Sequence, residues 1–163
     1  RVISYNGIQR LTPDNQGEMV YGGSDLVVCD GDYDALLALD LPDDARTAVR
    51  QAQVYDEAAS ACFRGFFASR RNYDVAQGLD GRGRPCSGVL EQSWRIGGAS
   101  GAEIAALEAF AGGARGAVRA STVELYGEGQ PVPDTAIVLF RDHDAEVGFI
   151  TKYVTVEDYG NPE

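Results

Sequence analysis

Residues 72–101 restrict the folds open to this chain more than any other part of its sequence. Strand-forming residues at 66–77 and 87–92 flank the turn signal Asp80-Gly81, and an alanine-rich run follows at 101–110. This order predicts two strands joined by a tight turn, then a glycine-rich turn, then a helix. The stretch therefore favours a fold whose strands pair locally and antiparallel.

A second helix is predicted over residues 42–62, where apolar side chains recur every three or four positions. Pro42 and the acidic residues after it are typical of a helix start. Asn6-Gly7 predicts a hairpin turn, and residues 22–25 are interpreted as a bulge or turn, or alternatively as a loop facing a ligand. Further strands are predicted at residues 2–5, 8–11, 26–29, 63–67, 117–126, 135–140 and 149–156, with loops at 12–17, 127–134 and 141–148 and a frayed end at 161–163.

These elements predict an α+β fold with a mostly antiparallel sheet. The helices at residues 42–62 and 101–110 are expected on one side of that sheet. The β-rich residues 115–163 are expected to form an extension packed on a domain made by residues 1–114.

Composition excludes several classes of partner. The net charge of -11 argues against duplex nucleic acid and against an anionic membrane surface, because both attract basic patches. No apolar run approaches a membrane span, and no signal peptide is recognisable. Cys29, Cys62 and Cys86 are widely spaced, which favours buried free thiols in a reducing cytoplasm. Lys152 is the only lysine, so a phosphate-clamping lysine is not expected from this chain.

The acidic residues of the 72–101 segment are the best candidates for chemistry. Asp74 lies in the first predicted strand, and Glu91 closes the second. Ser93 follows two residues later and thus shares a face with Glu91. If the strands pair, these oxygen ligands converge, and they are of the kind that Mg²⁺ prefers. Alternatively, they are ordinary acids on exposed strands.

A locally basic patch surrounds the same segment. It serves either as surface charge balance or, as we favour, as an anion site, because arginine binds phosphate and carboxylate through two parallel hydrogen bonds. The glycine-rich turn at residues 97–101 offers backbone N–H groups to the same anion. The patch consists of Arg70, Arg71, Arg82, Arg84 and Arg95.

Other catalytic designs are disfavoured by residue counts. His143 is the only histidine and is predicted to lie in a surface loop, and no nucleophile-elbow motif accompanies it. One histidine and three scattered cysteines give no zinc-ligand spacing. The acidic clusters at residues 30–34 and 40–44 lack a complete calcium loop and are interpreted as solvated turns and helix caps.

The order of elements resembles the C-terminal half of the ATP-grasp superfamily, over residues 2–111. In that superfamily a strand ending in a metal-binding acid precedes a strand carrying Glu-x-Asn, a glycine-rich loop and a helix. A closer likeness is to an uncharacterised bacterial family of ATP-grasp-like proteins, and it extends into the tail. It is carried by the phrases Tyr-Gly-Gly-Ser-Asp-Leu-Val-Val from Tyr21, Phe-Phe-Ala-Ser-Arg-Arg-Asn-Tyr-Asp-Val-Ala-Gln from Phe66 and Glu-Gln-Ser-Trp-Arg-Ile-Gly-Gly-Ala-Ser-Gly from Glu91.

The resemblance assigns roles to individual residues. It implies that Asp74 and Glu91 bind Mg²⁺ between ATP phosphates, with Ser93 in place of the family's asparagine as a third metal ligand. It implies that Arg71, Asn72 and Ser100 contribute to cofactor binding. The catalytic positions, which hold the acyl-phosphate or the incoming substrate, are by the same resemblance Arg95, Gly97 and Gly98.

The implied function is the Mg-ATP-binding, substrate-side half of an ATP-dependent carboxylate–amine ligase that acts through an acyl-phosphate. Small-molecule carboxylate and amine substrates are the implied partners. So is an ATP-grasp segment preceding Arg1, because members of the family are about twice as long. The alternative is a non-catalytic ATP-grasp-fold protein that serves in binding or as a scaffold. The expected location is cytoplasmic, and a homo-oligomer is left open.

Overall fold

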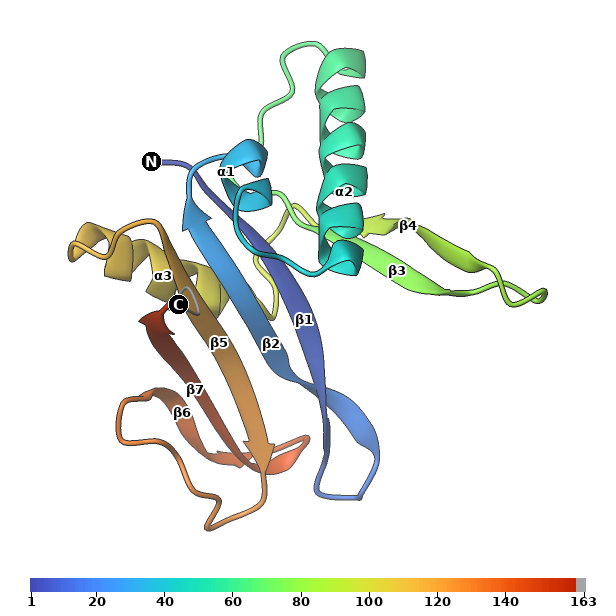
Figure 1. The fold of residues 1–163 in the computed structure, drawn as a ribbon. Coiled ribbons are helices and arrows are strands. Elements are labelled where there is room, and N and C mark those ends of the chain that lie inside the picture. Colours follow the sequence, from blue (N-terminus) through green and yellow to red (C-terminus); the bar gives the residue numbers. More distant parts are fainter. Residues whose placement is uncertain (161–163) are drawn as a thin grey trace. The chain divides into compact units, whose positions relative to one another are not determined.

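The computed structural model describes residues 1–160, and in it the chain forms two units, each with its own sheet and its own helical part (Figure 1). Unit 1 comprises Arg1–Asp32 and Gly98–Glu163, and unit 2 comprises Tyr33–Gly97. The expected frayed end at residues 161–163 lies outside the described residues. The α+β class and the mostly antiparallel pairing are confirmed, although the unit boundaries differ from the predicted boundary after residue 114.

Unit 1 is a five-stranded sheet in which all neighbouring strands are antiparallel. Helix α3 (Ser100–Ala111) packs against β2, β5 and β7, and thus covers one face of the sheet. The strand order is β1 (Ile3–Pro13), β2 (Met19–Asp30), β5 (Ala117–Tyr126), β7 (Gly148–Asp158) and β6 (Ile137–Asp144).

The core of unit 1 lies between α3 and this face of the sheet. Alternate residues of β2 and β5 point toward the helix, because side chains of a strand alternate between its faces. Phe110 supplies the largest side chain that α3 buries there, and only 2% of its surface is exposed. The buried cluster consists of Leu26, Val28, Ala102, Ala106, Phe110, Val118 and Ala120.

Strand β2 carries a bulge, as the interpretation of residues 22–25 as a bulge or turn predicted. Arg10 pairs with Gly23 and Leu11 with Tyr21, so Gly22 is the extra residue. Gly23 has φ +119°, and a Cβ there would lie 2.0 Å from the carbonyl oxygen of Thr122. The neighbouring strand β5 therefore requires glycine at this position.

The predicted hairpin turn at Asn6-Gly7 is wrong, since both residues lie inside the continuous strand β1. Asn6 pairs with Val27, and Gly7 pairs with Leu26. A Cβ on Gly7 would lie 2.5 Å from Cδ2 of Leu26, so this glycine gives room to a core side chain. Tertiary packing thus overrides the local turn propensity.

Unit 2 consists of two helices and one hairpin. Helix α1 (Tyr33–Leu37) precedes α2 (Asp43–Cys62), and α2 packs on the hairpin of β3 (Tyr73–Leu79) and β4 (Pro85–Gln92). The α2 prediction is confirmed at both ends. Arg46 donates hydrogen bonds to the carbonyls of Leu37, Leu39 and Leu41, and so ties the segment after α1 to the first turns of α2.

Several other predictions need correction. The two main helices pack on different sheets, so they do not share one side of a single sheet. Residues 63–67 form a turn and irregular backbone in place of a strand. His143 lies in β6, opposite Phe149, and not in a loop. Cys29 is buried, and burial raises the pKa of its thiol, but Cys62 and Cys86 are exposed.

None of the helices within residues 1–160 is long and apolar enough to cross a membrane.

Candidate functional site

The β3–β4 hairpin places the two predicted metal-binding carboxylates side by side. Asp74 pairs directly with Glu91 across the antiparallel ladder, and both side chains are exposed. Directly opposed residues of an antiparallel pair have Cβ atoms about 4.5–5.5 Å apart on the same face. A bulge follows immediately, because Val75 pairs with Val89 and leaves Leu90 as the extra residue. The two carboxylates therefore lie at a local irregularity of the hairpin.

Asn72 and Ser93 extend this face by one more pair. The Ser93 N–H donates to the Asn72 carbonyl at 2.8 Å, so pairing continues past the end of each strand. The Asn72 amide nitrogen donates to Oδ1 of Asp74 at 2.9 Å, which places both side chains on one side. We call the four residues Asn72, Asp74, Glu91 and Ser93 the acidic face of the hairpin.

Arg70 fixes the chain that leaves the acidic face. Its guanidinium donates to the carbonyl of Ser93 at 2.8 Å and also to the carbonyl of Arg95. The side chain of Arg95 itself is exposed and donates to the carbonyl of Ile96 at 3.2 Å. Arg70 thus orders the backbone between Ser93 and Arg95 by binding carbonyls.

The opposite face of the hairpin turns toward α2. Tyr73 and Gln92 pair there, and their hydroxyl and amide groups bond to Asp56 and Tyr55 of the helix. Asp56 is only 8% exposed, and it also accepts from the Arg71 guanidinium at 2.8 Å. Arg71 is therefore held on the α2 side and not beside Asp74.

This buried carboxylate perturbs two tyrosines. Burial, and after it the hydrogen bond and negative charge of Asp56, raise the pKa of Tyr73 well above its ordinary value. Burial, followed by the charge of Asp56, raises the pKa of Tyr33 to about 12. Of the two, the Tyr73 hydroxyl donates its proton in a hydrogen bond to Oδ1 of Asp56.

The remaining predicted residues lie after β4 and on both sides of the unit boundary. Gly97 ends unit 2, whereas Gly98 and Ser100 belong to unit 1. A Cβ on Gly98 would lie 2.3 Å from the Tyr21 hydroxyl oxygen, so close packing explains this glycine. Ser100 begins α3 and is 5% exposed, which leaves little of its surface for a cofactor.

The described residues contain no group of three or more histidine, cysteine, aspartate or glutamate side chains placed to hold a metal ion. The acidic face offers two carboxylates, with an amide and a hydroxyl beside them. That donor set fits Mg²⁺, which is commonly held by one or two carboxylates together with substrate phosphates and water. It does not fit a metal that needs an all-protein cage.

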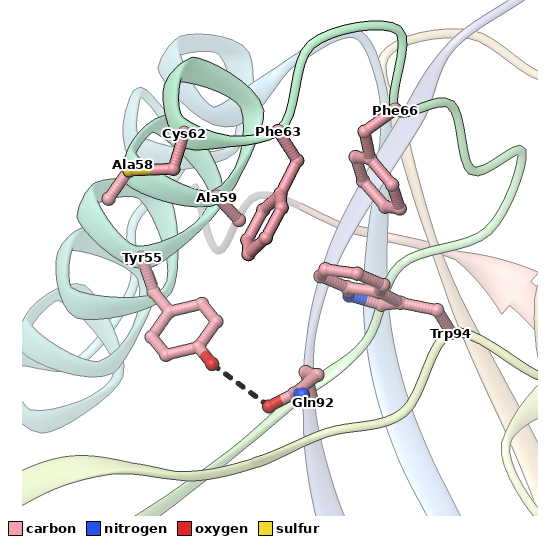
Figure 2. Close-up of a pocket in the computed structure, with 8 residues that line it drawn as sticks. All are labelled: Tyr55, Ala58, Ala59, Cys62, Phe63, Phe66, Gln92 and Trp94. Carbon is pink, nitrogen blue, oxygen red and sulfur yellow. Dashed lines mark hydrogen bonds between the residues drawn. The ribbon is translucent and has the colours of Figure 1, made fainter.

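A second feature of unit 2 was not predicted from the sequence. Aromatic side chains line a hollow of about 550 Å³ between the end of α2 and the segment after β4 (Figure 2). We call it the aromatic hollow and define it by Tyr55, Phe63, Phe66, Gln92 and Trp94. The available signal was the group Phe63, Phe66 and Phe67 directly after a predicted helix, which we interpreted as a strand.

The chain matches the sequence model of a family described as "Protein of unknown function (DUF3182)" over residues 1–154. It belongs to this family. DUF3182 membership thus covers the acidic face, the aromatic hollow and nearly all of both units. No curated protein and no solved structure matches the chain.

Proposed function

We propose that the acidic face binds Mg²⁺ together with the phosphates of ATP. In this proposal the chain is the metal-binding, substrate-side half of an ATP-dependent carboxylate–amine ligase of the ATP-grasp type. The observation that carries the proposal is the direct pairing of Asp74 with Glu91, next to the pair formed by Asn72 and Ser93. The likeness of the sequence to ATP-grasp proteins supplies the reaction type.

The residues of the acidic face have separate tasks in the proposal. Asp74 and Glu91 hold the ion, because their carboxylates are exposed on one face and close enough to share it. Asn72 orients Asp74 through its 2.9 Å hydrogen bond. Ser93 stands where the superfamily has asparagine, and its hydroxyl would serve as a third ligand. When bound, Mg²⁺ neutralises the charge that develops as a phosphoryl group moves to the substrate carboxylate.

The segment after Ser93 holds the substrate in this proposal. Arg95 is exposed, and its guanidinium can bind an acyl-phosphate through two parallel hydrogen bonds. Arg70 keeps the backbone of this segment ordered through the carbonyls of Ser93 and Arg95. Arg71 is left out of the nucleotide site, because Asp56 holds it on the opposite face.

The metal site is tested first and without nucleotide. Titration with Mn²⁺ as a paramagnetic substitute for Mg²⁺ is expected to broaden the backbone NMR signals of Asn72, Asp74 and Glu91 before all others. Asp74→Asn and Glu91→Gln should each abolish this selective broadening. Glu57→Gln, which removes an exposed carboxylate from α2, is the matched control and should leave the broadening unchanged. Broadening confined to the acid-rich unit 1 would overturn the metal assignment.

The nucleotide is tested second, by calorimetry with ATP and Mg²⁺. Heat that vanishes with EDTA and in Asp74→Asn supports the ligase proposal. Mn²⁺ binding without any nucleotide heat favours the alternative of a non-catalytic ATP-grasp-fold protein. The observation behind this alternative is Ser93, because a hydroxyl is a poorer metal ligand than the amide carbonyl of asparagine.

A further inference from the structure

We propose that the aromatic hollow of unit 2 binds a neutral, planar aromatic ligand that carries a hydrogen-bond acceptor. The hollow lies on the α2 side of the hairpin, since Gln92 turns toward Tyr55 while the neighbouring Glu91 belongs to the acidic face. The inference does not depend on Mg²⁺ or ATP, and it concerns residues that have no part in the proposed ligase function.

The walls of the hollow leave room for a small molecule. Its helical wall is built from Ala58, Ala59 and Cys62, whose short side chains create depth between the larger rings. The volume of about 550 Å³ is in the range of known ligand pockets, roughly 300–1,000 Å³. These dimensions suit a ligand of one to a few fused rings.

Aromatic rings supply the main binding surface. The Phe66 and Trp94 rings lie 4.6 Å apart between centroids with a tilt of 39°. The Phe66 ring points toward Trp94, and the Phe63 ring extends into the space between α2 and Trp94 (Figure 2). Phe63 is 64% exposed, so a ligand would remove a large apolar area from water. Because ring pairs gain affinity beyond buried area, these surfaces favour a planar aromatic partner over a saturated one.

A single amide gives the hollow its polar specificity. The Tyr55 hydroxyl donates to Oε1 of Gln92 at 2.9 Å, so the acceptor of this amide is engaged and its Nε2 group remains as the donor. Figure 2 shows this bond at one end of the hollow. The ligand should therefore present an acceptor, such as a carbonyl oxygen, to Gln92.

The absence of charge in the lining sets the charge of the ligand. No aspartate, glutamate, lysine, arginine or histidine side chain lines the hollow. A charged ligand would lose hydration without gaining a partner of opposite sign. A second, shallower hollow of about 660 Å³ continues along α2, but Arg50 lines it and Tyr55 is its only aromatic residue. The aromatic site is thus confined to the first hollow.

The test uses naphthalene-2-carboxamide as the probe and decahydronaphthalene-2-carboxamide, its saturated counterpart, as the control ligand. Trp94 is the only tryptophan of the chain, so its indole N–H signal in a ¹H–¹⁵N NMR spectrum reports the hollow directly. The aromatic probe is expected to shift this signal at millimolar concentration, and the saturated one should bind about tenfold more weakly or less.

Two matched variants locate the binding. Phe66→Leu keeps an apolar side chain but removes a ring of the hollow, and it should weaken the aromatic probe by about threefold to tenfold. Phe67→Leu makes the same change at an 85% exposed neighbour outside the lining and should have no effect. Should Phe66→Leu unfold unit 2, Gln92→Met replaces it, with an expected loss of about threefold.

The proposal is overturned by any of three results. These are no shift of the Trp94 signal with the aromatic probe, equal affinity for the saturated probe, or equal weakening by Phe66→Leu and Phe67→Leu. Equal affinity for both probes would identify an unspecific apolar surface of the kind that another polypeptide covers.

Discussion

The two units of this chain are stabilised by different interactions. Unit 1 buries a contiguous apolar cluster between α3 and its sheet, with Phe110 at one end. Unit 2 buries few apolar side chains among its described residues. Its helix α2 is connected to Tyr73 and Arg71 by hydrogen bonds to the buried carboxylate of Asp56. The comparison shows that one short chain contains a packed core and, beside it, a unit ordered by polar contacts.

Charge separates the two units as clearly as packing does. Unit 1 carries sixteen acidic and six basic residues, whereas unit 2 carries nine acidic and eight basic residues. Nearly all of the net charge of -11 therefore belongs to unit 1. Unit 2 combines near neutrality with exposed aromatic side chains, which are the features expected of a binding surface and not of a core.

The largest expected effect is on the core of unit 1. Phe110→Ala removes a side chain that is 2% exposed, and it should lower the free energy of unfolding of unit 1 by about 3–5 kcal/mol. Denaturant titration followed by the methyl NMR signals of Val28 and Val118 measures this loss. Phe67→Ala removes the same group from an 85% exposed position and should cost about 0.5 kcal/mol or less.

The second effect should be confined to unit 2. Asp56→Ala removes the acceptor of Tyr73 and Arg71, and it should destabilise this unit by about 2–3 kcal/mol, because two hydrogen bonds to a buried carboxylate are lost. Trp94 fluorescence during denaturant unfolding reports unit 2, since Trp94 is the only tryptophan.

The control for Asp56 is the next residue of the same helix. Glu57→Ala removes an exposed carboxylate and should change the stability by about 0.5 kcal/mol or less. If Asp56→Ala shifted the methyl signals of unit 1 as strongly as the fluorescence of Trp94, the two units would share one unfolding transition. The contrast between them would then be wrong.

Alkaline pH should act on unit 2. Because the folded unit raises the pKa of Tyr33 to about 12 and also raises that of Tyr73, protonated hydroxyls stabilise it fully below the ordinary tyrosine value of about 10. This contribution is lost as the pH rises above that value through the folded pKa. Denaturant midpoints from Trp94 fluorescence should therefore fall with pH above about 10. Tyr33→Phe and Tyr73→Phe should each flatten this dependence.

Acidic pH should destabilise unit 1, so the stability of this unit should rise with pH in the acidic range. Burial opposes the ionised form of Asp25, but hydrogen bonds from Arg10 and Ser121 outweigh it and hold the pKa of Asp25 below its ordinary value. Its contribution is present above an ordinary pKa of about 3.9 and is lost as the pH falls through the folded pKa. The methyl signals of unit 1 measure this loss, and Ser121→Ala should diminish it.

The smallest expected effect is that of salt. Sixteen acidic residues against six basic ones make unit 1 repel itself, and ions screen this repulsion. Raising sodium chloride from low to physiological concentration should stabilise unit 1 by about 1 kcal/mol or less and unit 2 by less still. Equal stabilisation of both units would show that the charge asymmetry has no energetic consequence.

Long periodic segments were predictable from the sequence, and short signals were not. The helix beginning at Asp43 and strand β5 follow their patterns closely, because many residues contribute to each pattern. Asn6-Gly7 gave a wrong turn prediction. Its glycine leaves space for the side chain of Leu26, a residue distant in sequence. No single-sequence pattern records such a contact.

The acidic face was predictable in part. The hairpin itself was predicted, but its register was not, because a two-residue turn at Asp80-Gly81 would place Asp74 opposite Ser87. The structure instead has a loop at residues 80–84 and a bulge at Leu90, and together these bring Asp74 opposite Glu91. The face on which Arg71 lies could also have been predicted. Side chains of an extended chain alternate between two faces, and Arg71 is three residues from Asp74, so the two side chains are expected on opposite faces. The aromatic hollow was not predictable, because it joins a helix end, an irregular segment and Trp94 through tertiary structure alone.

The interruption of unit 1 by unit 2 has a consequence for biosynthesis. Strand β2 cannot pair with β5 during synthesis until all of Tyr33–Gly97 and α3 have been translated, because these segments lie between the two strands in the sequence. Unit 2 contains the partners of its own polar contacts, so it can order on the ribosome while the sheet of unit 1 is incomplete. Until β5 is available, the β1–β2 hairpin exposes the unpaired edge of β2 at residues 23–29, which can pair with strands of other nascent chains.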